Sequence, residues 1–307
     1  MGAVFERGHG ARVDYTPVSS VLNDNEWDVI SEIAQAGEAA LYWDIGDTKA
    51  ITLNGTMGTL SLDTTLYVFI IGINHEHVNG ITFHGFKTAE TGGIDVTLID
   101  SKNGSTDVSG RKYFNINHWG SSSSPYSTNY GGWKGCDLRY DVLGSTDTAP
   151  SGYGSTATTS RVGYDAGAAT ATNPVPNTLM SCLPSDLRAV MRPMTIYTDN
   201  TGNSSAVEAN VTASIDYLPL MAEYEVFGTR KYANTYEQNR QTQYAYYADG
   251  NNSKTKYKHN STSSGAGWWL RSARSDSNYR FLRLGSSGNQ TYGSPHYSYA
   301  ISPMFLV

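Results

Sequence analysis

The chain has 307 residues, enough for one large domain or two small ones, and only 16% of them are charged. The formal net charge of −6 provides no basic footprint, which argues against nucleic acid as a partner. No apolar run approaches the roughly 18–20 residues that span a bilayer, so we expect no membrane insertion. The low charge, with 22 Tyr and 31 Gly, is typical of extracellular or virion proteins rich in strands and turns.

The N-terminal third predicts a tether, one helix and an antiparallel sheet. Residues 1–22 lack periodicity and are expected to form the tether. A helix capped by Asn23 or Asp24 should run past Trp27 and stop at Gly37, because its apolar residues recur at helical spacing. Strands are expected, with a turn at Asn54-Gly55, over residues 49–53, 59–62, 65–73, 81–86 and 94–99.

The middle of the chain predicts long loops with a few short elements. Residues 101–176 are rich in Gly, Ser and Thr, and loops of this length are usually functional or packed on themselves. The two cysteines, Cys136 and Cys182, cannot form a disulfide framework and are expected to be free thiols among apolar neighbours. The elements expected here are helices over 136–143, over 177–194 with a break at Pro184, and over 220–227 before Gly228, and a strand over 211–218.

The stretch Asn74-His75-Glu76-His77 is the first candidate for a chemical site. On a strand, alternation would place His75 and His77 on one face, as chelation by paired histidines requires. No further His, Cys or Asp cluster with recognisable spacing accompanies them. A structural or solvated role is therefore favoured, and no metal or cofactor is expected.

The other polar sets give no strong enzyme signal. Asp137 and Asp141 would share one helix face as a carboxylate pair, but a solvated face or a loop-anchoring salt bridge through Arg139 is favoured. Trp119 and Trp133 are expected to pin long loops to the core. Neither a nucleophile elbow nor a convincing phosphate loop is found in the sequence.

The last forty residues are the most informative part of the chain. Apolar blocks at 268–272 and 300–307 enclose a stretch in which fifteen of the thirty residues 271–300 are Ser, Tyr, Asn, Asp or His. Such a composition is typical of a paratope, where Tyr supplies rigid contact area and Ser, Gly and Asn supply adaptable hydrogen bonds. Strands are expected over 268–271, 279–284 and 299–307. Four tyrosines with Arg and His are expected to converge on one exposed face, as in binding hot spots: Tyr279, Tyr292, Tyr297, Tyr299, Arg274, Arg280 and His296.

Segments of the chain resemble a domain family of C-type lectin-like fold that occurs in gut bacteria and their phages. The block Trp268-Trp269-Leu270-Arg271-Ser272 and the closing Ile301-Ser302-Pro303-Met304-Phe305-Leu306 carry most of the likeness, which residues 68–75 and 217–228 extend. The resemblance spans roughly residues 40–307 and implies an α+β, C-type lectin-like domain with long loop insertions over residues 23–307. A relation to the formylglycine-generating enzyme fold is more remote.

Some members of this fold are variable proteins of diversity-generating retroelements, whose C-terminal segment is rewritten by reverse transcription that mutates template adenines. Asn-type codons then change to Asp, Ser, Tyr, His, Arg and others, but never to Lys, Glu, Gln, Met or Trp. Residues 272–299 fit this alphabet except for Gln290, so the resemblance implies that they are the variable region. The implied ligand-binding residues are Ala273, Arg274, Asp276, Asn278, Tyr279, Arg280, Ser286, Asn289, Thr291, Tyr292, Ser294, His296, Tyr297 and Tyr299. The implied scaffold residues are Trp268, Trp269, Leu270, Arg271, Pro303 and Phe305.

The implied function is non-enzymatic recognition of a protein or glycan ligand on a cell surface, at a phage tail tip or on a bacterial surface. Several copies in a homo-oligomer would raise the avidity. The calcium-binding motifs of calcium-dependent lectins are absent, and both cysteines precede the Trp268–Ser272 block, unlike the catalytic cysteines of the formylglycine-generating branch. Three alternatives remain: a glycan-binding module of fixed specificity, an oxidative enzyme of that branch, and a purely structural virion domain.

Overall fold

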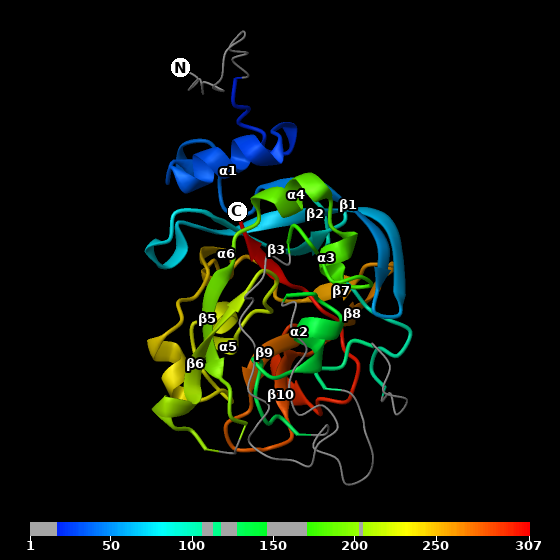
Figure 1. The fold of residues 1–307 in the computed structure, drawn as a ribbon, viewed down its shortest axis with the longest axis vertical. Coiled ribbons are helices and arrows are strands. Elements are labelled where there is room, and N and C mark those ends of the chain that lie inside the picture. The colour runs from blue at the N-terminus through cyan, green and yellow to red at the C-terminus, as the bar shows by residue number, and fades with distance from the viewer. Residues whose placement is uncertain (1–16, 106–112, 118–127, 146–170, 203–204) are drawn as a thin grey trace.

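The computed structural model describes residues 17–105, 113–117, 128–145, 171–202 and 205–307 (Figure 1). In this part of the chain the fold is mixed α/β, with one seven-stranded, one three-stranded and one two-stranded sheet. The strands are β1 (Thr48–Met57), β2 (Leu60–Ile73), β3 (Ile81–Lys87), β4 (Asp95–Thr97), β5 (Met194–Asp199), β6 (Val211–Asp216), β7 (Lys256–Lys258), β8 (Ser261–Ala266), β9 (Trp269–Ala273), β10 (Phe281–Leu284), β11 (Gln290–Gly293) and β12 (Met304–Leu306). The α-helices are α1 (Trp27–Gln35), α2 (Asp137–Asp141), α3 (Leu179–Cys182), α4 (Ser185–Val190), α5 (Glu223–Phe227) and α6 (Ala245–Ala248).

The large sheet joins the beginning of the described chain to its end. Its order is β1-β2-β3-β4-β7-β8, and β12 also pairs with β3. Phe305 of β12 lies opposite Phe83, whereas β4 pairs further along β3, where Val96 lies opposite Phe86. Gly85 lies between the two pairings. A Cβ there would lie 2.0 Å from the Ser302 hydroxyl oxygen, so the strands approach closely at this point. The C-terminal strand therefore lies in the middle of the molecule (Figure 1).

Helix α1 forms where apolar residues recur at helical spacing, as predicted. Trp27 is buried and meets Phe83 and Phe305 edge-on, with ring centroids 5.4 and 6.2 Å apart. Gly37, at φ 80°, follows the helix, which confirms the predicted stop. The predicted cap was wrong: Glu26 is the N-cap residue, because the Asn23 side chain instead accepts the backbone N–H of Ala50 at 2.8 Å.

The predicted turn at Asn54-Gly55 was also wrong. Strand β1 continues through both residues, and the hairpin turns after Met57, which pairs with Leu60. Gly55 has a φ of 132°, which other residues rarely adopt, and a Cβ there would lie only 3.2 Å from the Cys182 Sγ. At this Asn-Gly pair the chain does not reverse, and Gly55 instead lies close to helix α3.

Most of the other elements lie where they were predicted. Strands β4 and β6, helix α2 and the pair α3 and α4 fall within their expected ranges, and β3 extends one residue beyond its expected range. Helix α5 ends at Gly228, whose φ of 63° is the left-handed cap that glycine favours. The sequence analysis missed strands β5, β7, β8 and β11. No helix in the described ranges has both the length and the apolar character needed to cross a membrane.

A buried ion pair anchors the middle of the chain. Arg139 of α2 donates to Asp216 of β6 at 2.5 Å, and both side chains are buried. Asp216 also accepts the Trp133 ring N–H at 3.3 Å. The loop-anchoring salt bridge and the loop-pinning role of Trp133 are thus confirmed, while Trp119 lies outside the described residues.

The two cysteines are free, as expected. Burial raises the pKa of the Cys136 thiol to about 12 and that of the Cys182 thiol to about 11. A thiol in such surroundings is a poor nucleophile, because the thiolate is the reactive form.

Candidate binding surface at the C-terminal strands

The three-stranded sheet, in the order β11-β10-β9, forms the base of the candidate surface. All five residues of β9 are buried, and so is Trp268 before them. The Trp269 ring N–H donates to the carbonyl oxygen of Phe114 at 2.9 Å, and its ring meets that of Tyr299 edge-on with centroids 4.9 Å apart. The tryptophan pair therefore fixes β9 in the core, together with the buried scaffold residues Leu270, Pro303 and Phe305.

Arg271 is fully buried and forms an ion pair with Glu225 of α5. Its guanidinium donates to both carboxylate oxygens and, at 2.7 Å, to the carbonyl oxygen of Leu220. Glu225 in turn accepts the backbone N–H of Ala222 at 2.8 Å. Since a buried charge without a partner is strongly destabilising, this side chain ties β9 to α5.

Two further buried carboxylates hold the end of β9. The Ser272 hydroxyl donates to Glu237 at 2.7 Å and accepts the backbone N–H of Glu223 at 3.2 Å. Glu223 accepts the backbone N–H groups of residues 231–233. Burial raises the pKa of Glu237 to about 7, and the neighbouring Asp199 charge acts in the same direction. Arg271 and Ser272 are therefore parts of one polar network.

After β9 the chain is held mainly through its main-chain atoms and less through its side chains. We call residues 274–299 the polar segment. Asn129, which is buried, donates its side-chain N–H groups to the carbonyl oxygens of Arg274, Ser277 and Arg280 at 3.3, 2.7 and 3.0 Å. The Asn129 backbone N–H donates to the carbonyl oxygen of Asn278 at 2.9 Å. One residue outside the polar segment thus holds the turn between β9 and β10 through main-chain atoms.

The end of the polar segment is held in a similar way. The Asn115 side chain donates to the carbonyl oxygen of His296 at 2.7 Å, and the Asn117 backbone N–H donates to that of Pro295 at 3.0 Å. Ser298 is the exception, because its buried hydroxyl lies 2.8 Å from both carboxylate oxygens of Asp100. The residues around 100–117 therefore position residues 295–298.

One group of exposed side chains surrounds Arg274. Its guanidinium lies over the ring of Tyr292, 3.9 Å from the centroid, and 5.4 Å from that of Tyr232. The two tyrosine rings meet edge-on with centroids 5.3 Å apart, and Arg274 forms an ion pair with Asp276. We call these four residues the Arg274 cluster.

A second group surrounds Arg280. Arg280 lies over the ring of Tyr279, 4.7 Å from the centroid, and donates to the Ser294 hydroxyl. A chain of ring contacts continues from His296 through Tyr297 and Tyr299 to Arg283, which lies 4.2 Å from the Tyr299 centroid. Burial and the Arg280 charge lower the pKa of His296. We call the seven residues the Arg280 cluster: Tyr279, Arg280, Arg283, Ser294, His296, Tyr297 and Tyr299.

The register of the sheet separates Tyr292 from Tyr299. Tyr292 lies opposite Leu282 and Gly293 opposite Phe281, so consecutive residues of β11 face opposite sides. A Cβ at Gly293 would lie 2.8 Å from the Tyr299 ring, which places Tyr299 on the face away from Tyr292. The expected convergence of all four tyrosines on one face is therefore not found.

The structure exposes, fully or in part, all of the expected ligand-binding residues except Ala273. Ala273 is 1% exposed, because it lies on β9 opposite the buried Phe281, and its side chain is withdrawn from solvent. Ser286 and Asn289 belong to neither cluster, since they lie at the far end of β10 and β11. The exposed residues are Asp276, Tyr279, Ser286, Asn289 and Tyr292, and the half-buried ones are Arg274, Asn278, Arg280, Thr291, Ser294, His296, Tyr297 and Tyr299.

Several contributors were missed by the sequence analysis. Tyr232 joins the Arg274 cluster although it lies sixty residues before Tyr292. Asn129 and Asp100 were not singled out, since a lone polar residue in a long loop has no spacing pattern. The pair His75 and His77 was noticed, but the condition that it lies on a strand is not met, because the chain forms a 3₁₀ turn there, η3 (His75–His77). No group of three or more His, Cys, Asp or Glu placed to hold a metal ion occurs in the described ranges.

Residues 95–307, more than two thirds of the chain, match a family described as Domain of unknown function (DUF6273). The chain belongs to the DUF6273 family. The matched DUF6273 span begins at β4 and includes both clusters with all the anchors described above, whereas α1 and β1–β3 precede it. No curated protein and no solved structure matches the chain significantly.

Proposed function

We propose that this chain is a non-enzymatic ligand-binding protein whose ligand contacts the side chains of the polar segment. The likeness of the Trp268–Ser272 block to variable proteins of diversity-generating retroelements supports a C-type lectin-like scaffold with a diversified surface. The mixed α/β fold is compatible with that scaffold. The proposed partner is a protein on a cell surface, and the proposed setting is a phage tail or a bacterial surface.

The observation that carries this proposal is the way the polar segment is held. Asn129, Asn115 and Asn117 bond to its main-chain atoms, so these bonds do not depend on which side chain stands at Arg274, Arg280 or His296. Side chains can then be exchanged while the backbone keeps its course. A surface of this kind suits a protein that changes its ligand without changing its fold.

The chemistry of the exposed residues suits recognition of another macromolecule. Tyr279 is 49% and Tyr292 36% exposed, and each ring lies beside an arginine. Tyrosine and arginine are enriched among residues whose truncation most weakens protein interfaces. The stacked guanidinium groups also reduce the freedom of the tyrosines before binding, which lowers the entropic cost of association.

Diversification is tested by sequencing the DNA around this gene in several isolates. We expect a near-copy of the segment that encodes residues 272–299, which differs at adenines and lies beside a reverse transcriptase gene. The copy would list the variable positions, and we expect Tyr279 and Tyr292 among them but not Arg271 or Ser298. An invariant segment without a copy would overturn this part of the proposal and leave a site of fixed specificity.

Binding is tested with labelled protein on intact candidate host cells. Replacing Tyr279 and Tyr292 together by Ala should abolish attachment, whereas Leu41→Ala, which truncates a side chain that is 77% exposed elsewhere, should not. Loss of attachment after protease treatment of the cells would support a protein ligand. Retention after protease but loss after deglycosylation would assign the surface to a glycan. Attachment that survives both tyrosine replacements would contradict the proposal.

A further inference from the structure

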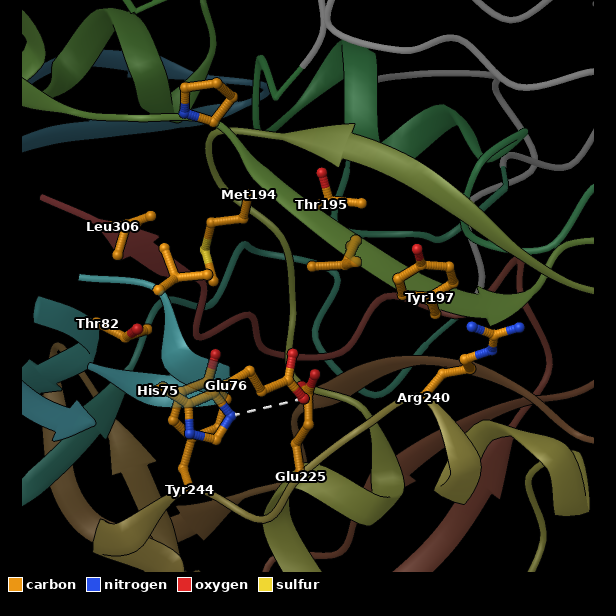
Figure 2. A pocket seen from close by; sticks show the side chains of 13 residues that line it. His75, Glu76, Thr82, Met194, Thr195, Tyr197, Glu225, Arg240, Tyr244 and Leu306 are labelled. Atoms are coloured by element: carbon orange, nitrogen blue, oxygen red, sulfur yellow. Dashed lines mark ion pairs between the residues drawn. The ribbon is translucent and has the colours of Figure 1, made fainter. Parts of the chain in front are cut away.

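A cavity of about 230 Å³ lies apart from the polar segment, between the η3 turn, strand β5, the chain around Tyr244 and the end of β12 (Figure 2). His75, Glu76 and Glu225 gather at one end (Figure 2). Met194, Ile196 and Leu306 are among the apolar residues that line the cavity. An apolar cavity of about 150 Å³ is large enough for benzene. This one therefore has room for a ligand slightly larger than one aromatic ring.

An unfavourable backbone conformation presents the polar end of the cavity. Asn74, Glu76 and His77 have φ of 50°, 53° and 64°, in the left-handed region that L-residues rarely adopt. The Asn74 side chain holds this turn, because it donates to the carbonyl oxygen of Gly37 at 2.9 Å and accepts the backbone N–H of Gly80 at 3.1 Å. Such strain concentrates at binding sites, where the surrounding structure enforces it.

The polar end carries two carboxyl groups, whereas Arg240 lines another part of the cavity, with its guanidinium 5.6 Å from the ring centroid of Tyr197 (Figure 2). Glu225 is buried, and within the described ranges Arg271 is the only arginine that forms an ion pair with it. Glu76 is 40% exposed, and burial together with the Glu225 charge raises the pKa of its carboxyl group. Glu76 therefore adds a second carboxyl group beside Glu225, whose charge Arg271 already balances.

His75 adds an acceptor beside these carboxylates. Its ring stacks on Tyr244 with centroids 3.8 Å apart, and burial lowers its pKa, which favours the neutral imidazole. The Nε2 atom lies 3.9 Å from the Glu76 carboxylate and has no hydrogen-bond partner among the described residues. A neutral imidazole can accept a hydrogen bond through one ring nitrogen.

We propose that this cavity binds a small organic cation, a primary amine with a short apolar body. An ammonium group has three donors and no acceptor, which matches the carboxylate oxygens of Glu76 and Glu225. The apolar body would lie on Met194, Ile196 and Leu306 and remove their surface from water. The side chains of the polar segment take no part, so this inference stands independently of the proposed function.

The test titrates the full chain with three matched probes: 2-phenylethylamine, 2-phenylethanol and 3-phenylpropanoate. Binding is monitored by the NMR chemical shifts of the protein. We expect the amine to bind about tenfold more tightly than the alcohol, as one partly solvated charge pair allows, and the carboxylate to bind least. Glu76→Gln should remove the preference for the amine and leave the affinity for the alcohol unchanged. The matched control Glu32→Gln, at an exposed position on α1, should change neither affinity.

Met194→Ala tests the location of the apolar body. It should weaken the amine and the alcohol alike, because it truncates one of the apolar residues that both would contact. Equal affinity for amine and alcohol, an unchanged preference in Glu76→Gln, or no binding of the amine would each overturn the proposal. Glu225 is left intact in these variants because its loss would strand the buried Arg271 charge.

Discussion

Strand β9 and the polar segment are adjacent in sequence but are held in opposite ways. In β9 the side chains of Arg271 and Ser272 make the anchoring bonds, to Glu225 and Glu237. In the polar segment the main chain is held by Asn129, and most side chains are exposed or half-buried. Side-chain anchoring fixes residue identity, whereas main-chain anchoring fixes only the path of the chain. The boundary between a constant and a changeable sequence is therefore expected just after β9.

The largest contrast is between two arginines three residues apart. Arg271→Ala leaves Glu225 buried without its partner, and we expect a loss of about 3–5 kcal/mol in the free energy of unfolding. Arg274→Ala breaks an exposed pair with Asp276 and should lose about 1 kcal/mol or less. Denaturant unfolding of both variants measures the difference. Equal losses would contradict the distinction between the two regions.

The pH dependence of stability sharpens the account of β9. The pKa of Glu237 rises from an ordinary 4.5 to about 7 in the folded state, so its contribution is present below the unfolded pKa and lost as pH rises through the folded one. The shift corresponds to a loss on the order of 3 kcal/mol between these values. In Glu237→Gln this part of the pH dependence should vanish. A stability difference between wild type and variant that is constant with pH would show that Glu237 does not titrate as described.

Asn129→Ala tests the main-chain anchor. It removes the side-chain donor shared by three carbonyl oxygens, and we expect a loss of about 2 kcal/mol in the free energy of unfolding. Hydrogen exchange should accelerate at residues 274–280 first. Asn251→Ala, at an exposed position whose amide bonds to Asp249, is the control and should change stability little.

The elements that the sequence predicted are those with a local signal. Helix α1 has apolar residues at helical spacing, and α5 has a glycine at its end. Strand β11 was missed because Gln290-Thr291-Tyr292-Gly293 has no apolar alternation, and its pairing with β10 defines it instead. Conversely, Asn54-Gly55 has a local preference for a turn that the fold does not follow. Both residues lie within β1, where Gly55 is close to Cys182 of α3.

The candidate surface was predictable in location but not in organisation. Composition pointed to Tyr279 and Tyr292, which are exposed. The placement of Tyr292 and Tyr299 on opposite faces depends on the register of β10 and β11, which no residue pattern there specifies. The anchors could not be predicted from the sequence either, because Asn129 lies about 150 residues from the carbonyl oxygens to which it donates.

The most direct test of main-chain anchoring replaces five of the six exposed side chains of the polar segment at once by Ala, the five that were expected to bind ligand: Asp276, Tyr279, Ser286, Asn289 and Tyr292. Its free energy of unfolding is then compared with that of Asn129→Ala. We predict that the fivefold variant folds and loses no more stability than the single anchor variant, since exposed substitutions usually change stability by about 0.5 kcal/mol or less each, in either direction. A fivefold variant that unfolds, or loses several times more stability than Asn129→Ala, would show that the side chains hold the segment and would contradict the account.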